Sequence, residues 1–284
     1  MMPNHMMKTL FKSAVLLSFG WVIFPAWAEL KPQWELGVGV AGIDFPVYRG
    51  ADERKSYLLP VPYVQYHGDV VQVDRERMRG LLFRRDLVEM DISINGSVPV
   101  KSNDTAERYG MPDIDPILEI GPSVNVHLYF DEKRRTNLDL RLPVRAAIST
   151  DFSSVSFRGW LFQPSLNLDF RNMRQSGWNL GFVAGLLYAD QRYHQYFYDV
   201  APQYATATRP AYTAGGGYSG SQYIAALSKR FPGYWVGGFM KWDDLEGAAF
   251  MGSPLVTRGR AFSVGFAVSW ILSTSDKMVE VSDD

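Results

Sequence analysis

The 284-residue sequence contains no cysteine and only four histidines. Without cysteine, the chain can form no disulfide, thiolate metal site or cysteine nucleophile. None of the histidines belongs to an HExxH or HxxxH pair, so a zinc enzyme is not expected. We therefore expect a protein with no metal ion and no cofactor.

An excess of charge of one sign is also missing. The chain has 29 Lys and Arg residues against 30 Asp and Glu residues, a formal net charge of −1. A nucleic-acid-binding protein needs a basic surface that neutralises phosphates. The composition therefore argues against nucleic acid as a partner.

Long apolar runs are absent after the N-terminus. A membrane-spanning helix needs ~18 or more consecutive apolar residues, and no later segment approaches that length. The N-terminus has the pattern of a secretory signal, with Lys8 and Lys12, an apolar run over 13–24, and then Ala26-Trp27-Ala28. We expect residues 1–28 to be a cleaved signal peptide and the exported chain to have no helical anchor.

Apolar and polar residues alternate along most of the remaining chain. Every second residue from Leu118 to Phe130 falls on one side, and Glu119, Asn125 and His127 fall on the other. This period of two is typical of β-strands with one apolar face. The same pattern predicts strands over residues 34–45, 57–67, 88–98, 117–130, 136–149, 157–170, 178–190, 220–231, 234–243 and 259–272.

The length of these runs favours a membrane-spanning barrel over a soluble sandwich. Most last ten to thirteen residues, whereas strands of globular proteins average ~5–6 residues and a tilted membrane strand needs ~9–11. Trp34, Trp160 and Trp270 end apolar faces, as aromatic residues do at membrane interfaces. Lipid cannot satisfy an open sheet edge, so the sheet must close. We predict an all-β fold, a transmembrane antiparallel β-barrel over residues 29–272, followed by a polar periplasmic tail over 273–284.

Residues 70–85 decide the number of strands. If they form one strand, the total is eleven, an odd number that is not expected of a bacterial single-chain barrel. If they split near 76–78 into an upward strand 70–75 and a downward strand 79–85, the total is twelve. The split also places the long connections on one side of the membrane and the short turns on the other. We predict about twelve strands, with ten as the alternative.

The polar faces of these strands would line the lumen, and they carry charges of both signs. A pore that selects cations or anions would carry one sign. We interpret the mixed charges as an internal network that fills a narrow lumen, with a path for small solutes as the alternative. The candidate luminal network consists of Glu89, Asp91, Glu119, His127, Asp139, Arg141, Arg145 and Asp169.

The short turns, which would face the periplasm, are basic. Basic groups beside a membrane can hold anionic lipid headgroups or attract an acidic protein surface, and plain solvation is a third interpretation. We expect outer-membrane lipid as one partner and a periplasmic docking surface for another. The candidate docking residues are Arg84, Arg85, Lys133, Arg134, Arg135, Arg171 and Arg174.

No catalytic arrangement is recognisable in the sequence. There is no GxSxG or SxxK motif, and no Ser–His pair can be identified. Asp113 and Asp115 with Glu119 would suit acid–base chemistry or calcium, but the flanking prolines favour a rigid turn. We therefore expect no enzymatic activity.

The longest outer segment, residues 191–219, is rich in tyrosine, including Tyr193, Tyr196 and Tyr198. Such a loop would fold over the barrel mouth as a self-packed lid or contact a ligand through its aromatic area. Residues 215–217 are three glycines that precede a strand rather than a helix, so they indicate a flexible loop end and not a phosphate cradle.

Five short segments with a distinctive composition are spread over about residues 34–272. The segments are Pro46-Val47-Tyr48-Arg49-Gly50-Ala51-Asp52, Tyr57-Leu58-Leu59-Pro60-Val61-Pro62-Tyr63, Gly110-Met111-Pro112-Asp113-Ile114-Asp115-Pro116 with Glu119-Ile120-Gly121-Pro122, Ala211-Tyr212-Thr213-Ala214-Gly215-Gly216-Gly217, and Ser253-Pro254-Leu255-Val256. Taken together and in this order, they resemble the MipA/OmpV family of Gram-negative outer-membrane proteins.

This resemblance implies location in the Gram-negative outer membrane and a scaffold role without catalytic residues. The best-known members bind a membrane-bound lytic transglycosylase and help couple it to a bifunctional murein synthase, so a periplasmic murein hydrolase or synthase is the implied partner in peptidoglycan biosynthesis. Other members are linked to adhesion, osmotic response or antibiotic susceptibility, and a narrow diffusion channel or a surface adhesion or stress-response protein stays open as the alternative. One feature departs from the family, whose members usually end near an aromatic residue of the last strand. Here about fourteen residues follow Trp270.

Overall fold

The computed structural model describes residues 29–67, 71–73, 78–80, 83–85, 87–131, 135–150 and 154–281. The predicted signal peptide, residues 1–28, lies outside this part of the chain. Among the described residues, the structure contains no helix with the length and apolar character needed to cross a bilayer.

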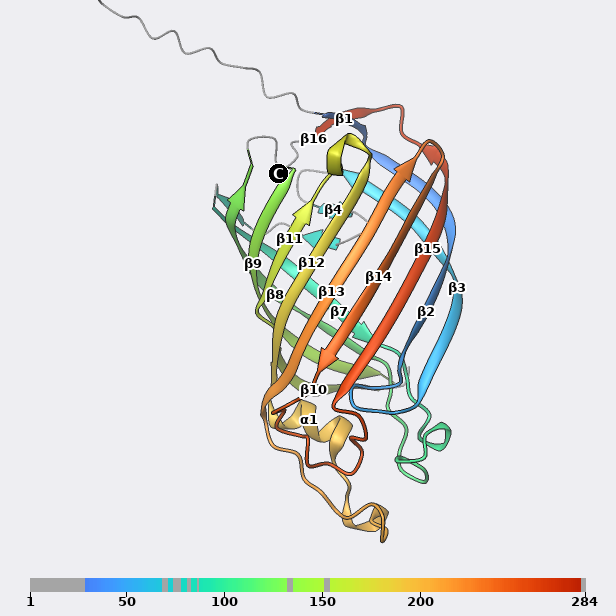
Figure 1. The fold of residues 1–284 in the computed structure, drawn as a ribbon, viewed down its shortest axis with the longest axis vertical. Helices are drawn as coiled ribbons and strands as arrows, with labels where there is room; N and C mark the ends of the chain where they lie inside the picture. Colours follow the sequence, from blue (N-terminus) through green and yellow to red (C-terminus); the bar gives the residue numbers. More distant parts are fainter. Residues whose placement is uncertain are drawn as a thin grey trace, which may run out of the picture.

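Long antiparallel strands form the wall of the molecule (Figure 1). Their neighbours follow the chain, except that the first long strand pairs with the last and so forms a closing seam, with Ala41 opposite Ala267. One wall strand is interrupted next to Pro164, and its two halves, β10 and β11, both lie between β9 and β12. The long strands are β2 (Trp34–Pro46), β3 (Arg54–His67), β7 (Val88–Ser97), β8 (Ile117–Phe130), β9 (Thr136–Thr150), β10 (Val155–Phe162) with β11 (Ser165–Phe170), β12 (Trp178–Ala189), β13 (Gly217–Phe231), β14 (Tyr234–Asp244) and β15 (Arg260–Thr274).

Three short strands lie between β3 and β7. β4 (Val71–Val73) pairs with the end of β3, β5 (Met78–Gly80) pairs with β4, and β6 (Phe83–Arg85) pairs with the start of β7. β5 and β6 run in the same direction, because both are antiparallel to upward strands. Counted as one strand, they complete a ring of twelve with the directions predicted for residues 70–85. Only ten strands of this ring are long in the described residues, and ten is the alternative strand number given by the sequence.

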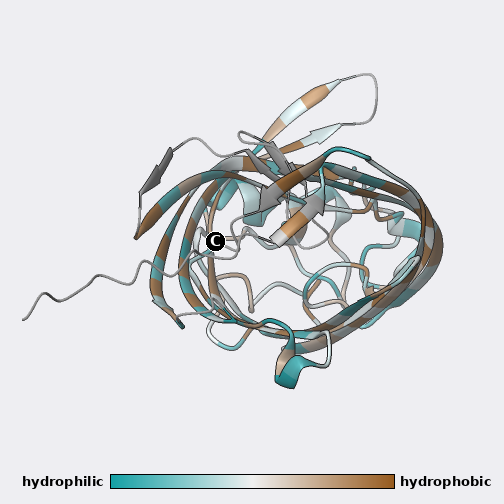
Figure 2. Cartoon of the chain, turned by 90° about the horizontal axis from the view of Figure 1, so that it is seen from above, coloured by the Kyte–Doolittle hydropathy of each residue, from teal (hydrophilic) through white to brown (hydrophobic). Residues whose placement is uncertain are grey.

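Apolar side chains cover the outside of the wall, and polar side chains face inward. Phe266 is 62% exposed and Met240 is 54% exposed, whereas Asp91, on the opposite face, is 1% exposed. Figure 2 looks along the barrel and shows the strands as a ring along which hydrophilic and hydrophobic residues alternate. A soluble sheet would bury its apolar face, so this arrangement is that of a transmembrane barrel. The predicted fold class is confirmed.

The hydrophobic core of the protein lies at one end of the barrel, in a structure that we call the cap. The cap consists of residues 46–53, 98–116, 190–216 and 245–259, and it contains η1 (Ser102–Asp104), α1 (Gln191–Tyr198) and η3 (Pro202–Tyr204). Figure 1 shows it below the strands, with α1 at the barrel end. Its main buried apolar residues are Val47, Tyr48, Ala51, Val100, Ile114, Phe197, Tyr198, Ala214, Leu245, Ala248 and Phe250.

The first and last strands of the described chain pair at the opposite end of the barrel. β1 (Glu29–Pro32) pairs with β16 (Met278–Val281) in a separate two-stranded sheet, which we call the terminal ribbon. Hydrogen bonds from Gln33 N to Lys277 O, at 2.8 Å, and from Ser275 N to Trp34 O, at 2.9 Å, join the ribbon to the barrel seam. The tail predicted after residue 272 therefore begins within β15 and contains a strand of its own.

Candidate functional site

The predicted luminal residues come together on β7, β8 and β9. Arg145 and Glu119 form an ion pair with Nε and Oε2 3.2 Å apart, and both side chains are buried. Asn95 donates to the same Oε2 at 3.2 Å, and Arg145 Nη1 donates to Ser93 Oγ at 3.2 Å. Buried charges are tolerated when they are paired and hydrogen-bonded. In this cluster, the buried charges of Arg145 and Glu119 therefore neutralise each other.

A second cluster lies on the same strands. Asn125 Nδ2 donates to Asp91 Oδ2 at 3.0 Å, and Arg141 Nη2 lies 3.5 Å from the same oxygen. Nearer the chain termini, His127 Nδ1 lies 2.7 Å from Asp139 Oδ1. Six of the eight predicted luminal residues therefore take part in pairs within this network.

The other two predicted luminal residues share the inward face. Glu89 lies opposite Asn125 on the neighbouring strand, and Asp169 lies opposite Asn137. The inner face therefore combines acidic and basic groups across several strands, which suits filling and stiffening the lumen better than selecting ions of one sign.

Helix α1 reaches this network from the cap. The Tyr193 hydroxyl donates to Glu119 Oε1 at 3.0 Å. The helix begins after Asp190, whose side chain caps it by accepting from Tyr193 N at 2.9 Å. Gly159 lets β10 pass close to the Asp190 side chain, because its φ is +128° and a Cβ at this position would lie 2.1 Å from Asp190 Oδ1. The start of α1 is thus wedged against the inner wall.

His194, the next residue of α1, is completely buried at 0% exposure. Its Nδ1 lies 2.6 Å from Gly215 O, and its Nε2 lies 2.6 Å from Ser219 Oγ. The phenyl ring of Phe250 packs against the imidazole in an edge arrangement, with ring centroids 4.9 Å apart and planes at 72°. Burial lowers the pKa of His194 below its ordinary value, so the neutral imidazole is favoured.

The sequence did not reveal this Ser–His pair, because the partners lie 25 residues apart on different elements. Of the three glycines expected to form a flexible loop end, Gly217 is the first residue of β13. Gly216 packs against α1 so closely that a Cβ would lie 2.7 Å from Gln191 N.

Aromatic side chains hold the rest of the cap together. Tyr198 stacks on Phe250 with centroids 3.8 Å apart and planes 4° apart. Tyr198 also donates from its hydroxyl to Arg49 O at 2.9 Å, and Tyr48 donates to Leu255 O at 2.8 Å. Burial raises the pKa of both phenols well above the ordinary value. The tyrosines therefore act as neutral hydrogen-bond donors. Residues 191–219 pack on the rest of the cap, which agrees with the interpretation of this loop as a self-packed lid.

Charged groups fasten the cap to the wall. Asp243 on β14 is buried and accepts from Arg49 Nε at 3.0 Å, and its other oxygen lies 3.0 Å from Lys241 Nζ. Arg49 also donates through Nη1 to Ser219 O at 2.7 Å. Loss of Arg49 would leave Asp243 with one cation and Ser219 O without this donor.

Arg108 joins two segments of the cap through hydrogen bonds to backbone carbonyls. It donates to Phe197 O at 2.9 Å and to Pro112 O at 3.0 Å, and burial lowers its pKa. The carboxylates considered for acid–base or calcium chemistry serve the same loop, since Asp113 accepts from Ser102 N at 2.7 Å and Asp115 accepts from the Tyr196 hydroxyl at 3.3 Å. In the described part of the chain, no group of three or more His, Asp or Glu side chains could hold a metal ion.

The segments that carry the family resemblance fall largely in the cap. Residues 46–52, 110–116, 211–216 and 253–256 belong to it, and they meet although they are up to about 200 residues apart in the chain. The resemblance and the tyrosine content were the sequence signals that pointed to this region.

The basic turns lie at the end of the barrel that carries the termini. Arg135 and Arg171 meet there through a 2.6 Å hydrogen bond from Arg171 N to Arg135 O. Arg174 is exposed in the turn between β11 and β12, which contains η2 (Met173–Gln175). Three residues of this turn, Asn172, Arg174 and Gln175, have left-handed φ values of 48°, 49° and 63°, a conformation that costs energy outside glycine.

The remaining predicted docking residues are less defined. Arg84 and Arg85 belong to β6, for which only the strand is described, and Lys133 and Arg134 lie outside the described residues. Arg230, close to the same end, points inward instead and pairs with Glu35, with Nη2 and Oε1 2.6 Å apart.

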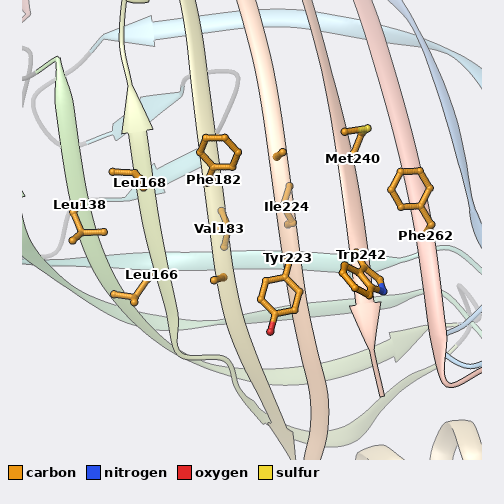
Figure 3. A pocket seen from close by; sticks show the side chains of 12 residues that line it. Leu138, Leu166, Leu168, Phe182, Val183, Tyr223, Ile224, Met240, Trp242 and Phe262 are labelled. Atoms are coloured by element: carbon orange, nitrogen blue, oxygen red, sulfur yellow. The ribbon is translucent and has the colours of Figure 1, made fainter. Parts of the chain in front are cut away.

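The outer surface of the wall carries a shallow apolar groove of about 490 Å³ (Figure 3). Phe182, Tyr223, Met240, Trp242 and Phe262 lie along it, and Ala184 and Ala225 are among the residues that line it. The groove contains no charged residue, and its exposed side chains belong to the apolar outer surface of the barrel.

The ring of antiparallel strands, with its apolar outer face and charged inner face, defines a membrane-spanning β-barrel. Within that class, the chain belongs to the family described as MltA-interacting protein MipA, whose model matches residues 38–272. Comparison with the curated proteins finds no match.

Solved structures similar to this chain have low sequence identity. A bacterial polysaccharide outer membrane secretin is 9% identical, with 84% of this chain and 99% of that chain covered and a TM-score of 0.44. The monoaromatic hydrocarbon channel CymD is 10% identical, with coverages of 87% and 68% and a TM-score of 0.23. The toluene transporter TbuX of Ralstonia pickettii is 9% identical, with coverages of 86% and 70% and a TM-score of 0.21. Likenesses of this size carry no argument about function.

Proposed function

We propose that this protein is a non-enzymatic scaffold of the Gram-negative outer membrane that holds murein-remodelling enzymes at its periplasmic end. Membership of a family described as an MltA-interacting protein carries the proposal. The partner would be a lytic transglycosylase, with a murein synthase as a second member of the assembly.

The distribution of loops supports the orientation. β1, β16 and the short turns at 171–177 and 232–233 lie at one end, and the long connections form the cap at the other. In bacterial barrels the short turns face the periplasm and the long loops face outward. The terminal ribbon and the basic turns would therefore face the compartment in which murein enzymes act.

The contacts of the candidate chemical groups favour binding over catalysis. Six of the eight predicted luminal residues are paired with one another, and both members of the Ser219–His194 pair are buried. A nucleophile and its base need access to a substrate. Within the described residues, these groups serve the packing of the cap and the wall.

A diffusion channel is the weaker alternative. The cap places a packed apolar core at the outer end of the barrel, and Tyr193 extends from it to the luminal network. A solute path would require this core to move.

The test is capture of a purified membrane-bound lytic transglycosylase by the full-length barrel in detergent. Reversal of the charges of one turn, by Lys133→Glu, Arg134→Glu and Arg135→Glu together, should weaken capture about tenfold or more, because like charges would then face an acidic partner. The matched control reverses three cations of the cap, Lys101, Arg192 and Arg258, and should leave capture unchanged. Equal capture by the native protein and the turn variant would show that this turn is not the docking surface. Absence of capture by the native protein would show that the transglycosylase is not a partner.

A further inference from the structure

We propose that the periplasmic rim of the barrel binds the phosphate headgroup of an anionic phospholipid. The proposed site, which we call the rim site, consists of Lys229, Trp178, Phe231 and the 171–177 turn with Arg171 and Arg174. It shares Arg171 and Arg174 with the proposed docking surface, but its test measures lipid binding in the absence of a murein enzyme.

Lys229 belongs to the lipid-facing side of β13. It lies two and six residues after Leu227 and Tyr223, which are exposed on the outer face, and successive outward residues of a strand are spaced by two. Trp178 of β12 is its partner across the strands, so both side chains share the outer face. A cation on this face is tolerated only near the membrane boundary, where it can reach the headgroups.

Aromatic rings mark that boundary. Lys229 Nζ lies 5.5 Å from the centre of the Trp178 ring and 4.8 Å from the centre of the Phe231 ring. Phe231 stacks on Tyr234, with centroids 4.6 Å apart, and Tyr234 lies opposite the half-exposed Trp270 of β15. Tryptophan and tyrosine concentrate at the depth of lipid headgroups. The ammonium group is therefore held at the depth of the phosphates.

The charge of the rim site is positive and uncompensated. Among the described residues, Lys229, Arg171 and Arg174 form no ion pair with a carboxylate, whereas the adjacent Arg230, which points inward, is paired with Glu35 at 2.6 Å. Lys229, which lies on the outer face, can therefore attract an anion, with the two arginines of the turn at the same end of the barrel. Because Lys229 lies on the lipid-facing side of the wall, that anion is a membrane lipid rather than a soluble protein.

The turn beside Lys229 is held in one conformation. Asn172 Oδ1 accepts from Gly177 N at 2.8 Å, and Asn172 N donates to Asn179 Oδ1 at 2.9 Å. The aliphatic stem of Lys229 passes beside Gly177, where an added Cβ would lie 3.4 Å from Lys229 Cε. These contacts fix the turn at the same end of the barrel as the ammonium group of Lys229.

The experiment measures lipid binding by the full-length barrel in a zwitterionic detergent. Phosphatidylglycerol and phosphatidylcholine with the same acyl chains are titrated, and bound lipid is counted by native mass spectrometry. The native protein should prefer phosphatidylglycerol, and each cation removed should weaken that preference about fivefold, since a Lys or Arg near an anionic surface contributes about that factor. Lys229→Gln with Arg174→Gln is the test variant, and Lys101→Gln in the cap is the control at a site far from the rim.

Each outcome decides the proposal. Preference for phosphatidylglycerol that is lost in the double variant and kept in Lys101→Gln supports it. Equal binding of the two lipids by the native protein, or a preference that survives in the double variant, overturns it. Competition by inorganic phosphate alone would show an anion site without lipid specificity and would also overturn it. If the double variant does not fold, Arg174→Gln alone, in an exposed turn, gives the same comparison.

Discussion

The hydroxyl of Tyr193 donates a hydrogen bond to Glu119 Oε1 at 3.0 Å, and the other oxygen of that carboxylate lies 3.2 Å from Arg145 Nε. One side chain of the cap is thereby joined to an ion pair of the barrel wall. The cap is therefore part of the barrel's polar interior as well as a cover over its end.

Tyr193→Phe should destabilise the protein by about 1–3 kcal/mol, because it leaves a buried carboxylate oxygen without its donor. The midpoint of thermal unfolding in detergent measures the effect. Tyr212→Phe is the matched control, since its hydroxyl makes only a long 3.4 Å contact to Ala249 O at the surface. An equal drop of the unfolding midpoint in both variants would show that the hydrogen bond from Tyr193 to Glu119 does not stabilise the protein.

Acid should loosen the cap through His194. Burial lowers the pKa of this imidazole below its value in the unfolded chain, which is about 6.5. The unfolded state therefore binds the proton more readily, so stability is full above about pH 6.5 and falls as the pH drops toward the lower folded pKa.

Hydrogen exchange of residues 190–216 between pH 7.5 and pH 5, corrected for the intrinsic effect of pH on amide exchange, measures this dependence. Protection should fall on acidification in the native protein, and the change should be smaller in His194→Gln, which cannot take up the proton. The same acid response in both proteins would assign it to other groups.

The packed cap predicts that the native barrel is silent in a planar bilayer. Replacement of residues 191–213 by a short Gly-Ser linker removes α1 and Tyr193 from the outer mouth, so single-channel current should appear. Tyr212→Phe, which keeps the helix, should stay silent. Current through the native protein would favour the channel function, and silence of the linker variant would place the obstruction deeper in the lumen.

The wall could be predicted from the sequence because the alternation of inward and outward residues depends only on neighbouring positions in the chain. In a strand the inward and outward faces alternate residue by residue, so Glu119 and Asp91 could be assigned to the lumen without knowledge of their partners. The cap could not be predicted in this way. Its contacts join segments far apart in the chain, such as the hydrogen bond from Tyr48 to Leu255 across 207 positions, and no periodic pattern marks them.

The terminal ribbon escaped prediction for a related reason. Its strands have four residues each, too few to show a period of two, and the polar composition after Trp270 indicated only a solvated tail. The short strands β4, β5 and β6 likewise carry too little pattern to fix their lengths.

The absence of natural cysteine makes the terminal ribbon directly testable by disulfide trapping. Leu30 lies opposite Glu280 in its register, and opposite residues of an antiparallel pair have Cα atoms ~4.5–5.5 Å apart, within the range that a disulfide spans. Leu30→Cys with Glu280→Cys should therefore cross-link in the oxidising periplasm, which is measured by loss of maleimide-reactive thiols and by faster migration on a non-reducing denaturing gel. Leu30→Cys with Val279→Cys is the control, because Val279 points to the other face of the ribbon and should keep its thiol. Equal cross-linking of the two pairs would mean that the chain ends meet without a fixed register, and absence of both cross-links would mean that they do not meet.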